Sequence, residues 1–174
     1  MKKRYFATGV VVPLLNTLLA TAAEKPNVIY IMCDDLGWGD VGCYGQQFIR
    51  TPHLDQMARE GMRFTQAYAG SPVSAPSRAS FMTGQHTGHT EVRGNKEYWR
   101  GVPMVKYGQN DEFSRVGQHP YDPDHIILPE IMKRNGYTTA MFGKWAGGYE
   151  GSHSTPDKRG IDEFYGYICQ FQAH

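Results

Sequence analysis

The sequence predicts an α/β fold, a mostly parallel sheet with helices on both faces, of which this chain holds an incomplete part. Residues 28–32 form a continuous apolar, β-branched run, which is typical of a strand buried on both sides of a parallel sheet. Two helix-like segments open on a proline and close on a glycine. Strand-like and helix-like segments also alternate along the chain, which favours a sheet covered by helices.

Each element follows from local signals of this kind. Proline suits the first turn of a helix, and glycine suits the residue that ends it. Short β-branched and aromatic runs between turn residues predict strands. The predicted elements are, in order, a strand over 28–32, a helix from Pro52 to Gly61, a strand over 63–69, a helix that begins near Pro76, a helix from Pro129 to Gly136 and a strand over 137–142. Residues 160–174 predict no closing strand, and we expect the domain to continue beyond His174.

The N-terminus reads as a secretory signal peptide over residues 1–22. It has a basic start, a mostly apolar stretch over 5–19 and small residues at 20–22. The apolar stretch is short and interrupted by Pro13, so we expect no stable membrane anchor. The expected location of the mature chain, residues 23–174, is therefore periplasmic or extracellular. The 18 basic and 17 acidic residues nearly cancel, and this balance excludes nucleic-acid binding through bulk charge.

Three chemically unusual clusters follow predicted strands. Asp34 and Asp35 come after the first strand, the segment from Ser74 to Arg78 comes after the second, and Lys144 comes after the third. Ligands of open α/β sheets bind beyond the carboxyl ends of the strands. We therefore expect the three clusters to meet at one site.

The adjacent acids have two interpretations. Two carboxylates at a buried strand end repel each other, and a bound cation removes that cost. Their hard oxygen atoms suit Ca²⁺ or Mg²⁺ better than zinc. Alternatively, Asp34 and Asp35 form a turn in which their side chains bond backbone amides.

The serine segment is also open to two interpretations. With Pro76 in the first helical turn, Ser74 is expected just ahead of the helix, where free amides and the helix dipole attract an anion. Arg78 can turn a permanent planar cation toward the same anion. The alternative is an ordinary capped helix with a surface arginine.

At this point the sequence resembles a known family. The residues S-A-P-S-R at 74–78, with Thr83-Gly84 downstream, closely resemble the C/S-x-P-x-R signature of the type I sulfatases. The run PNVIYIMCDDLGWGDVGCYG resembles the opening metal-binding strand of that family, TPHLDQMAREGMRFTQAYA its next segment, and GKW at 143–145 its third landmark. The resemblance implies an alkaline-phosphatase-like fold. It also implies that residues 23–174 are the N-terminal portion of a catalytic domain of the serine type.

The resemblance implies a role for each site residue. Ser74 is converted to formylglycine by an anaerobic radical maturation enzyme, as in many bacteria. Asp34 and Asp35 bind calcium, in preference to magnesium, together with the group derived from Ser74. Arg78 steadies the formylglycine and the sulfate, and Lys144 contacts the sulfate or the leaving oxygen.

The sequence departs from the family pattern after the lysine. The family often has G-K-W-H, and this chain has Ala146 in place of the histidine. The proton donor is therefore unassigned, with His86, His89 and His153 as candidates or, alternatively, loop histidines. The later family motifs, an Asp-Asn pair for calcium and further Lys and His residues, are expected beyond His174. The loop HTGHTEVRGNKEYW either lines a sugar pocket or is a solvated surface loop.

Three functions follow as hypotheses. The first is an exported sulfatase, a sulfuric ester hydrolase that cleaves sulfate monoesters of carbohydrates or of another sulfate ester substrate; this chain alone is expected to be poorly active. The second is a phosphoester hydrolase of the same superfamily that uses unmodified Ser74 directly. The third is an inactive fragment that only binds sulfate or a sugar.

Overall fold

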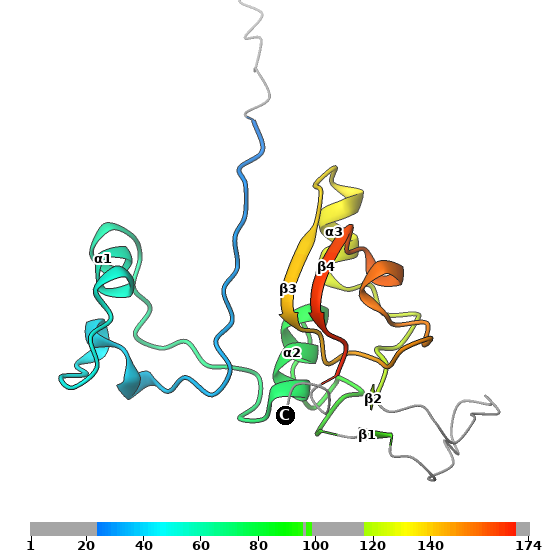
Figure 1. Cartoon of the computed structure of the whole chain (residues 1–174), viewed down its shortest axis with the longest axis horizontal. Helices are drawn as coiled ribbons and strands as arrows, with labels where there is room; N and C mark the ends of the chain where they lie inside the picture. Colours follow the sequence, from blue (N-terminus) through cyan, green and yellow to red (C-terminus); the bar gives the residue numbers. More distant parts are fainter. Residues whose placement is uncertain (1–23, 96, 99–116, 170–174) are drawn as a thin grey trace, which may run out of the picture. The chain divides into compact units, whose positions relative to one another are not determined.

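The computed structural model describes residues 24–95, 97–98 and 117–169 (Figure 1). The predicted signal peptide, 1–22, lies outside the described residues. The chain divides into two compact units, one up to Met32 and one from Cys33 onward. In the first unit, the described residues are extended, and the apolar side chains of 28–31 are exposed, Ile29 at 87%.

The strand predicted over 28–32 therefore does not form among the described residues, and neither does the one over 63–69. In both segments the backbone belongs to no helix and to no sheet. A β-branched run favours extended backbone, but a strand exists only where a neighbouring strand supplies hydrogen bonds. The described part of the chain offers these two segments no such neighbour.

The three predicted helices are present: α1 (Pro52–Glu60), α2 (Ser74–Thr83) and α3 (Leu128–Arg134). Proline lies in the first turn of α1 and α3, as expected from its preset backbone angle. Gly84 ends α2 with a left-handed φ of +66°. The 3₁₀ turns η1 (Trp38–Asp40), η2 (Gly42–Tyr44) and η3 (Pro156–Arg159) complete the helical content of the described residues. None of the helices in these residues is long and apolar enough to cross a membrane.

A parallel pair of strands is the largest sheet in the described residues. β3 (Ala140–Lys144) pairs with β4 (Glu163–Tyr167), and Lys144 lies opposite Tyr167 (Figure 1). The expectation that no strand follows residue 160 was therefore wrong. The short strands β1 (Glu97–Tyr98) and β2 (Gly117–Gln118) pair antiparallel. Few helices and a small parallel sheet are consistent with an incomplete α/β fold.

Two glycines allow β3 and β4 to approach closely just before Lys144. Gly143 has a φ of +113°, a backbone conformation that residues with a Cβ rarely adopt. Its partner in the register is Gly166, and a Cβ on Gly166 would lie 1.8 Å from the carbonyl oxygen of Gly143. No other residue fits at position 166 without separating the strands.

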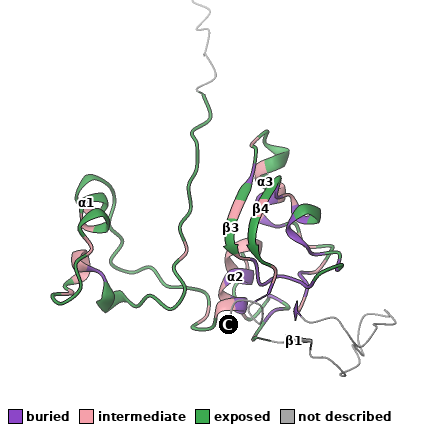
Figure 2. Ribbon diagram, in the orientation of Figure 1, coloured by how far each residue is buried: buried purple, intermediate pink, exposed green. Residues whose placement is uncertain are grey.

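The core lies between α2 and the segments that flank α3 and β3 (Figure 2). From α2, the small residues Ala75 and Ala79 are buried, so the helix can pack closely. Trp145, fully buried directly after β3, donates its indole N–H to the carbonyl of Ser154 at 2.8 Å. By contrast, α1 has no buried residue. The core thus fixes the two elements that carry Arg78 and Lys144.

A buried arginine fastens the segment before α3. Arg159, 3% exposed, pairs with Glu130 at 2.9 Å. Its remaining N–H groups donate to the carbonyls of Tyr121, Asp122 and His125 at 3.4, 3.1 and 2.6 Å. A buried charge is tolerated only when it is paired and hydrogen-bonded, and here both conditions are met.

Candidate active site

Side chains from three distant segments meet at the end of β3. Lys144 Nζ lies 2.5 Å from Asp34 Oδ2, and Arg78 Nη2 lies 3.7 Å from Asp34 Oδ1. Arg78 Nη1 also donates to the carbonyl of Lys144 at 2.8 Å. The expected convergence of Asp34, Arg78 and Lys144 is therefore present, and their catalytic roles remain predictions.

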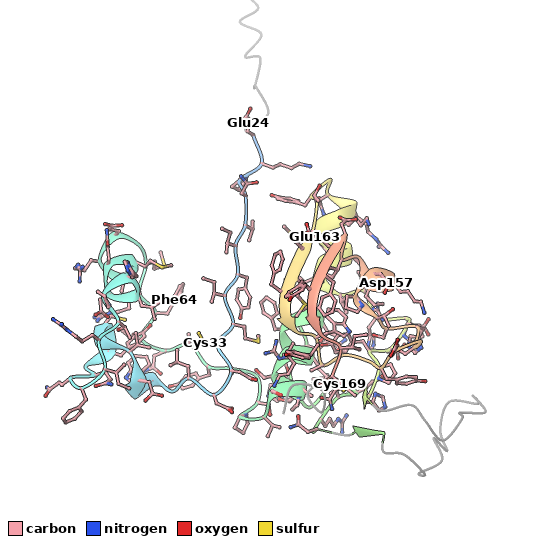
Figure 3. All side chains as sticks on the ribbon, in the orientation of Figure 1. Glu24, Cys33, Phe64, Asp157, Glu163 and Cys169 are labelled. Atoms are coloured by element: carbon pink, nitrogen blue, oxygen red, sulfur yellow. The ribbon has the colours of Figure 1, made fainter. Side chains whose placement is uncertain are left out.

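Regular elements hold both cations in place. Arg78 is the fifth residue of α2, and the neighbouring Ala79 anchors that helix in the core. Lys144 is the last residue of β3, and the pairing continues past it, because Trp145 N–H donates to the carbonyl of Tyr167 at 2.8 Å. Figure 3 draws all described side chains on the ribbon, those of α2, β3 and β4 among them. Hence the two cations are set by backbone structure and not by a flexible loop.

The site carries an excess of buried positive charge. The side chains of Arg78 and Lys144 are only 10% and 11% exposed, whereas that of Asp34 is 44% exposed. The hydrogen bond from Lys144 is the main cause that holds the pKa of Asp34 below its ordinary value, with Arg78 adding to it against the effect of burial. Asp34 therefore stays ionised, and two cations face one anion. The arrangement suits a second anion from outside.

One donor of the site has no acceptor. The Nε–H of Arg78 is buried and has no hydrogen-bond partner among the residues that the structure describes. A buried unpaired donor on a charged group is costly, because the group has lost its water without a replacement. An acceptor oxygen from a bound ligand would remove that cost.

Ser74 is the first residue of α2, not the residue ahead of it as predicted. The structure also corrects the expectation that free backbone amides at the start of α2 bind an anion. The N–H of Ala75 donates to Asn95 Oδ1 at 3.2 Å, Pro76 has no N–H, and the N–H of Ser77 donates to the carbonyl of the residue before the helix at 3.1 Å. Anion binding here depends on the cations more than on the helix amides.

Asp35 has a left-handed φ of 57° and is exposed. The described residues hold no group of three or more His, Cys, Asp or Glu side chains placed to bind a metal. Asp34 and Asp35 supply the carboxylate oxygens that Ca²⁺ prefers, so the donor type fits. Calcium takes six to eight oxygen ligands, however, and these two residues and Ser74 make up only part of such a set.

The candidate proton donors have bonds of their own. His153 Nε2 bonds the carbonyl of Tyr121 at 2.9 Å, a contact that fixes the chain before α3. His86 Nδ1 accepts the N–H of Gly88 at 3.0 Å, and the His86 ring meets that of His89 edge-on at 6.5 Å. These contacts are those of structural and loop histidines, and they leave the proton donor unassigned.

Ala146, at the position where the family often has histidine, is fully buried in the core cluster. It adopts a left-handed φ of 56°, and its N–H donates to the carbonyl of Ile168 at 2.9 Å. A histidine ring at this position would have to enter the core. The packing around Ala146 is therefore built for a methyl group.

Asn95 is the residue that the sequence did not reveal. It lies 20 positions from Ala75, and only the folded chain brings its side chain to the start of α2. Asparagine in a Gly-rich loop is common, so no spacing pattern marks this one.

Comparison with known proteins agrees with the geometry. The family model described as Sulfatase matches residues 26–171. The chain is 38% identical over 149 residues to human "Arylsulfatase D" and 34% identical over 166 residues to "N-acetylgalactosamine-6-sulfatase" of Rattus norvegicus. These matches cover 83% and 90% of this chain, but only 23% and 28% of the relatives.

Solved structures give the same picture. The crystal structure of Ps i-CgsB is 34% identical, with a TM-score of 0.68, over 84% of this chain and 29% of that one. The same protein has been solved in complex with k-i-k-neocarrahexaose, and this structure matches at 31% identity with a TM-score of 0.61, over 78% of this chain and 26% of that one. The chain thus spans about a quarter of the length of the proteins that it matches.

Proposed function

Because the chain belongs to the sulfatase family, we propose that it contributes the nucleophile and cation half of a sulfuric ester hydrolase that acts on sulfated carbohydrates. One observation carries the proposal: two nearly buried cations, Arg78 and Lys144, converge on Asp34 beside the helix that begins with Ser74. A sulfate ester carries a full negative charge, and a pair of desolvated cations is suited to hold it. The name of the rat relative and the sugar bound to Ps i-CgsB support a carbohydrate substrate.

The chemistry proposed for Ser74 requires its oxidation to formylglycine by a separate maturation enzyme. One hydroxyl of the hydrated aldehyde attacks the sulfur, the S–O bond to the alcohol breaks, and the alcohol takes a proton. The second hydroxyl then loses its proton and the C–O bond to sulfate breaks, which restores the aldehyde and releases sulfate. Addition of water regenerates the hydrate, so the net reaction consumes one water for each ester cleaved. An unmodified serine would retain the sulfate as a stable ester.

Arg78 and Lys144 would stabilise the charge on the transferring sulfuryl group. Fixed donors of this kind typically contribute ~10²–10³ in rate each. The Nε–H of Arg78 has no hydrogen-bond partner among the described residues, so it is available to a sulfate oxygen. Asp34, which pairs with both cations, would hold the side chains of Arg78 and Lys144 toward the sulfuryl group.

Asp34, Asp35 and the group derived from Ser74 would hold calcium. The ion would add positive charge beside the sulfate when bound. The remaining oxygen ligands of a complete set would have to come from residues other than these three. We also propose export of the protein, on the pattern of residues 1–22.

The test combines mass spectrometry and turnover. The peptide that carries Ser74, isolated from the native host, should be lighter by two hydrogen atoms than its sequence predicts. The protein from the same preparation should hydrolyse a sulfated oligosaccharide and should not hydrolyse the matching phosphate ester. An unmodified Ser74 together with phosphate ester hydrolysis would replace this proposal with the phosphoester hydrolase.

A further inference from the structure

The loop between α2 and Asn95 is tied closely to its own backbone. The Arg93 side chain donates to the carbonyls of Thr90 and Gly88 at 3.0 and 2.9 Å. Thr90 is 1% exposed and donates to the carbonyl of Val92 at 3.1 Å, and Val92 is itself part of the core. The loop therefore presents Asn95 at a defined position.

That position is the first turn of α2, next to Ser74. Asn95 Oδ1 accepts the N–H of Ala75 at 3.2 Å. An asparagine amide has its acceptor and its two donors on different atoms, so this bond uses the oxygen and leaves the two N–H groups of Nδ2 for another acceptor. Asn95 is exposed, so a ligand can reach the nitrogen.

The backbone at the start of α2, around Ser74, has few N–H groups left to bind an anion, so a neutral side-chain donor is needed there. Proline at position 76 removes one N–H from the first turn of α2, and the helix itself uses the N–H of Ser77. Arg78 and Lys144 approach from the side of Asp34. The sulfate group of an ester has three non-bridging oxygens, and an oxygen turned away from Arg78 and Lys144 would need a donor from another residue.

We propose that Asn95 is a substrate-binding residue whose Nδ2 donates a hydrogen bond to an oxygen of the sulfate group bound beside Ser74. The proposal rests on the function proposed above. In it, Asn95 has two tasks: its oxygen secures the start of α2, and its nitrogen binds the sulfate.

The two tasks can be separated by substitution. Asn95→Asp has nearly the same shape and keeps an oxygen for the N–H of Ala75, but it removes both donors. Asn95→Ala removes the oxygen and the nitrogen together. If the proposal is correct, the dissociation constant for inorganic sulfate rises at least 10-fold in both variants, a loss of about 1.4 kcal/mol. The melting temperature falls only in Asn95→Ala, because this variant alone loses the hydrogen bond to the N–H of Ala75.

The measurement is calorimetric titration of the purified protein with sodium sulfate, together with KM for a sulfated oligosaccharide. A repeat at ~0.5 M NaCl separates the lost donor from the added charge of Asn95→Asp, because salt screens long-range repulsion but does not restore a hydrogen bond. Sulfate affinity of Asn95→Asp within twofold of wild type, or its recovery at high salt, would overturn the proposal. If wild-type protein isolated from the native host, with Ser74 modified, binds sulfate and fails to hydrolyse any sulfate ester, the proposed function is wrong, while the role of Asn95 in sulfate binding is still decided by the titration.

Discussion

The buried arginine Arg159 allows a quantitative test of the structure that does not depend on function. Replacing it with methionine keeps an unbranched apolar stem of similar length to the aliphatic part of arginine but removes every N–H group. The carboxylate of Glu130 and the carbonyls of Tyr121, Asp122 and His125 would then lose a donor. Removing one partner of a buried pair costs about 3–5 kcal/mol, because the other charge is left without compensation. At about 2–4 °C for each kcal/mol in a chain of this size, the melting temperature should fall by roughly 6–20 °C.

Thermal unfolding followed by circular dichroism measures this change. The matched control is Lys133→Met, which breaks an ion pair to Asp162 whose side chains are 52% and 32% exposed. Exposed pairs contribute about 0.2–1 kcal/mol, so the control should melt within a few degrees of wild type. Equal, small shifts for Arg159→Met and Lys133→Met would refute the description of Arg159 as a buried anchor.

Three further predictions concern the site and its support. Arg78→Lys keeps a charge but loses the planar fork that reaches both the Lys144 carbonyl and Asp34. We expect kcat for a sulfate ester to fall by ~10²–10³. A fall below tenfold would contradict the role given to the fork. Gly166→Ala places a Cβ where the β3–β4 pairing leaves no space, so it should lower both the melting temperature and the affinity for sulfate. A melting curve identical to that of the wild type would show that the register of the two strands is wrong. The hydrogen bond from Lys133 is the main cause that lowers the pKa of Asp162 from 3.8 to about 2, so the stabilising effect of the ionised Asp162 is complete above pH 4 and is lost as the pH falls toward 2. In Asp162→Asn the midpoint of urea unfolding should therefore change less with pH across that window. The same pH dependence in the variant and the wild type would count against the contact.

The parts of the fold that follow from local signals were predictable. Pro52 and Gly61 bracket α1, because each residue has a backbone preference that acts without help from the rest of the chain. The strand β4 was missed because Gly166 interrupts its pattern and suggests a turn. That glycine is required by close contact with β3, which sequence spacing does not reveal.

The site was predictable where it depends on topology. Clusters that follow strand-like segments were expected to converge, and Asp34, Arg78 and Lys144 do so, although the residues before Asp34 form no strand in the described part of the chain. The positions of individual hydrogen bonds were not predictable. Asn95 reaches Ala75 through a loop whose path is set by Arg93 and other internal bonds, and that path leaves no periodic trace in the sequence.

The contact between Arg78 and the Lys144 carbonyl joins residues 66 positions apart. A ribosome adds roughly 5–20 residues each second, so about 3–13 seconds pass between the synthesis of the two partners. During that interval α2 is present without β3, whose Lys144 carbonyl later accepts an N–H of the Arg78 guanidinium. An enzyme that has to bind Ser74 and Arg78 in an open chain therefore has a window of this length before the Lys144 carbonyl can fix the Arg78 side chain.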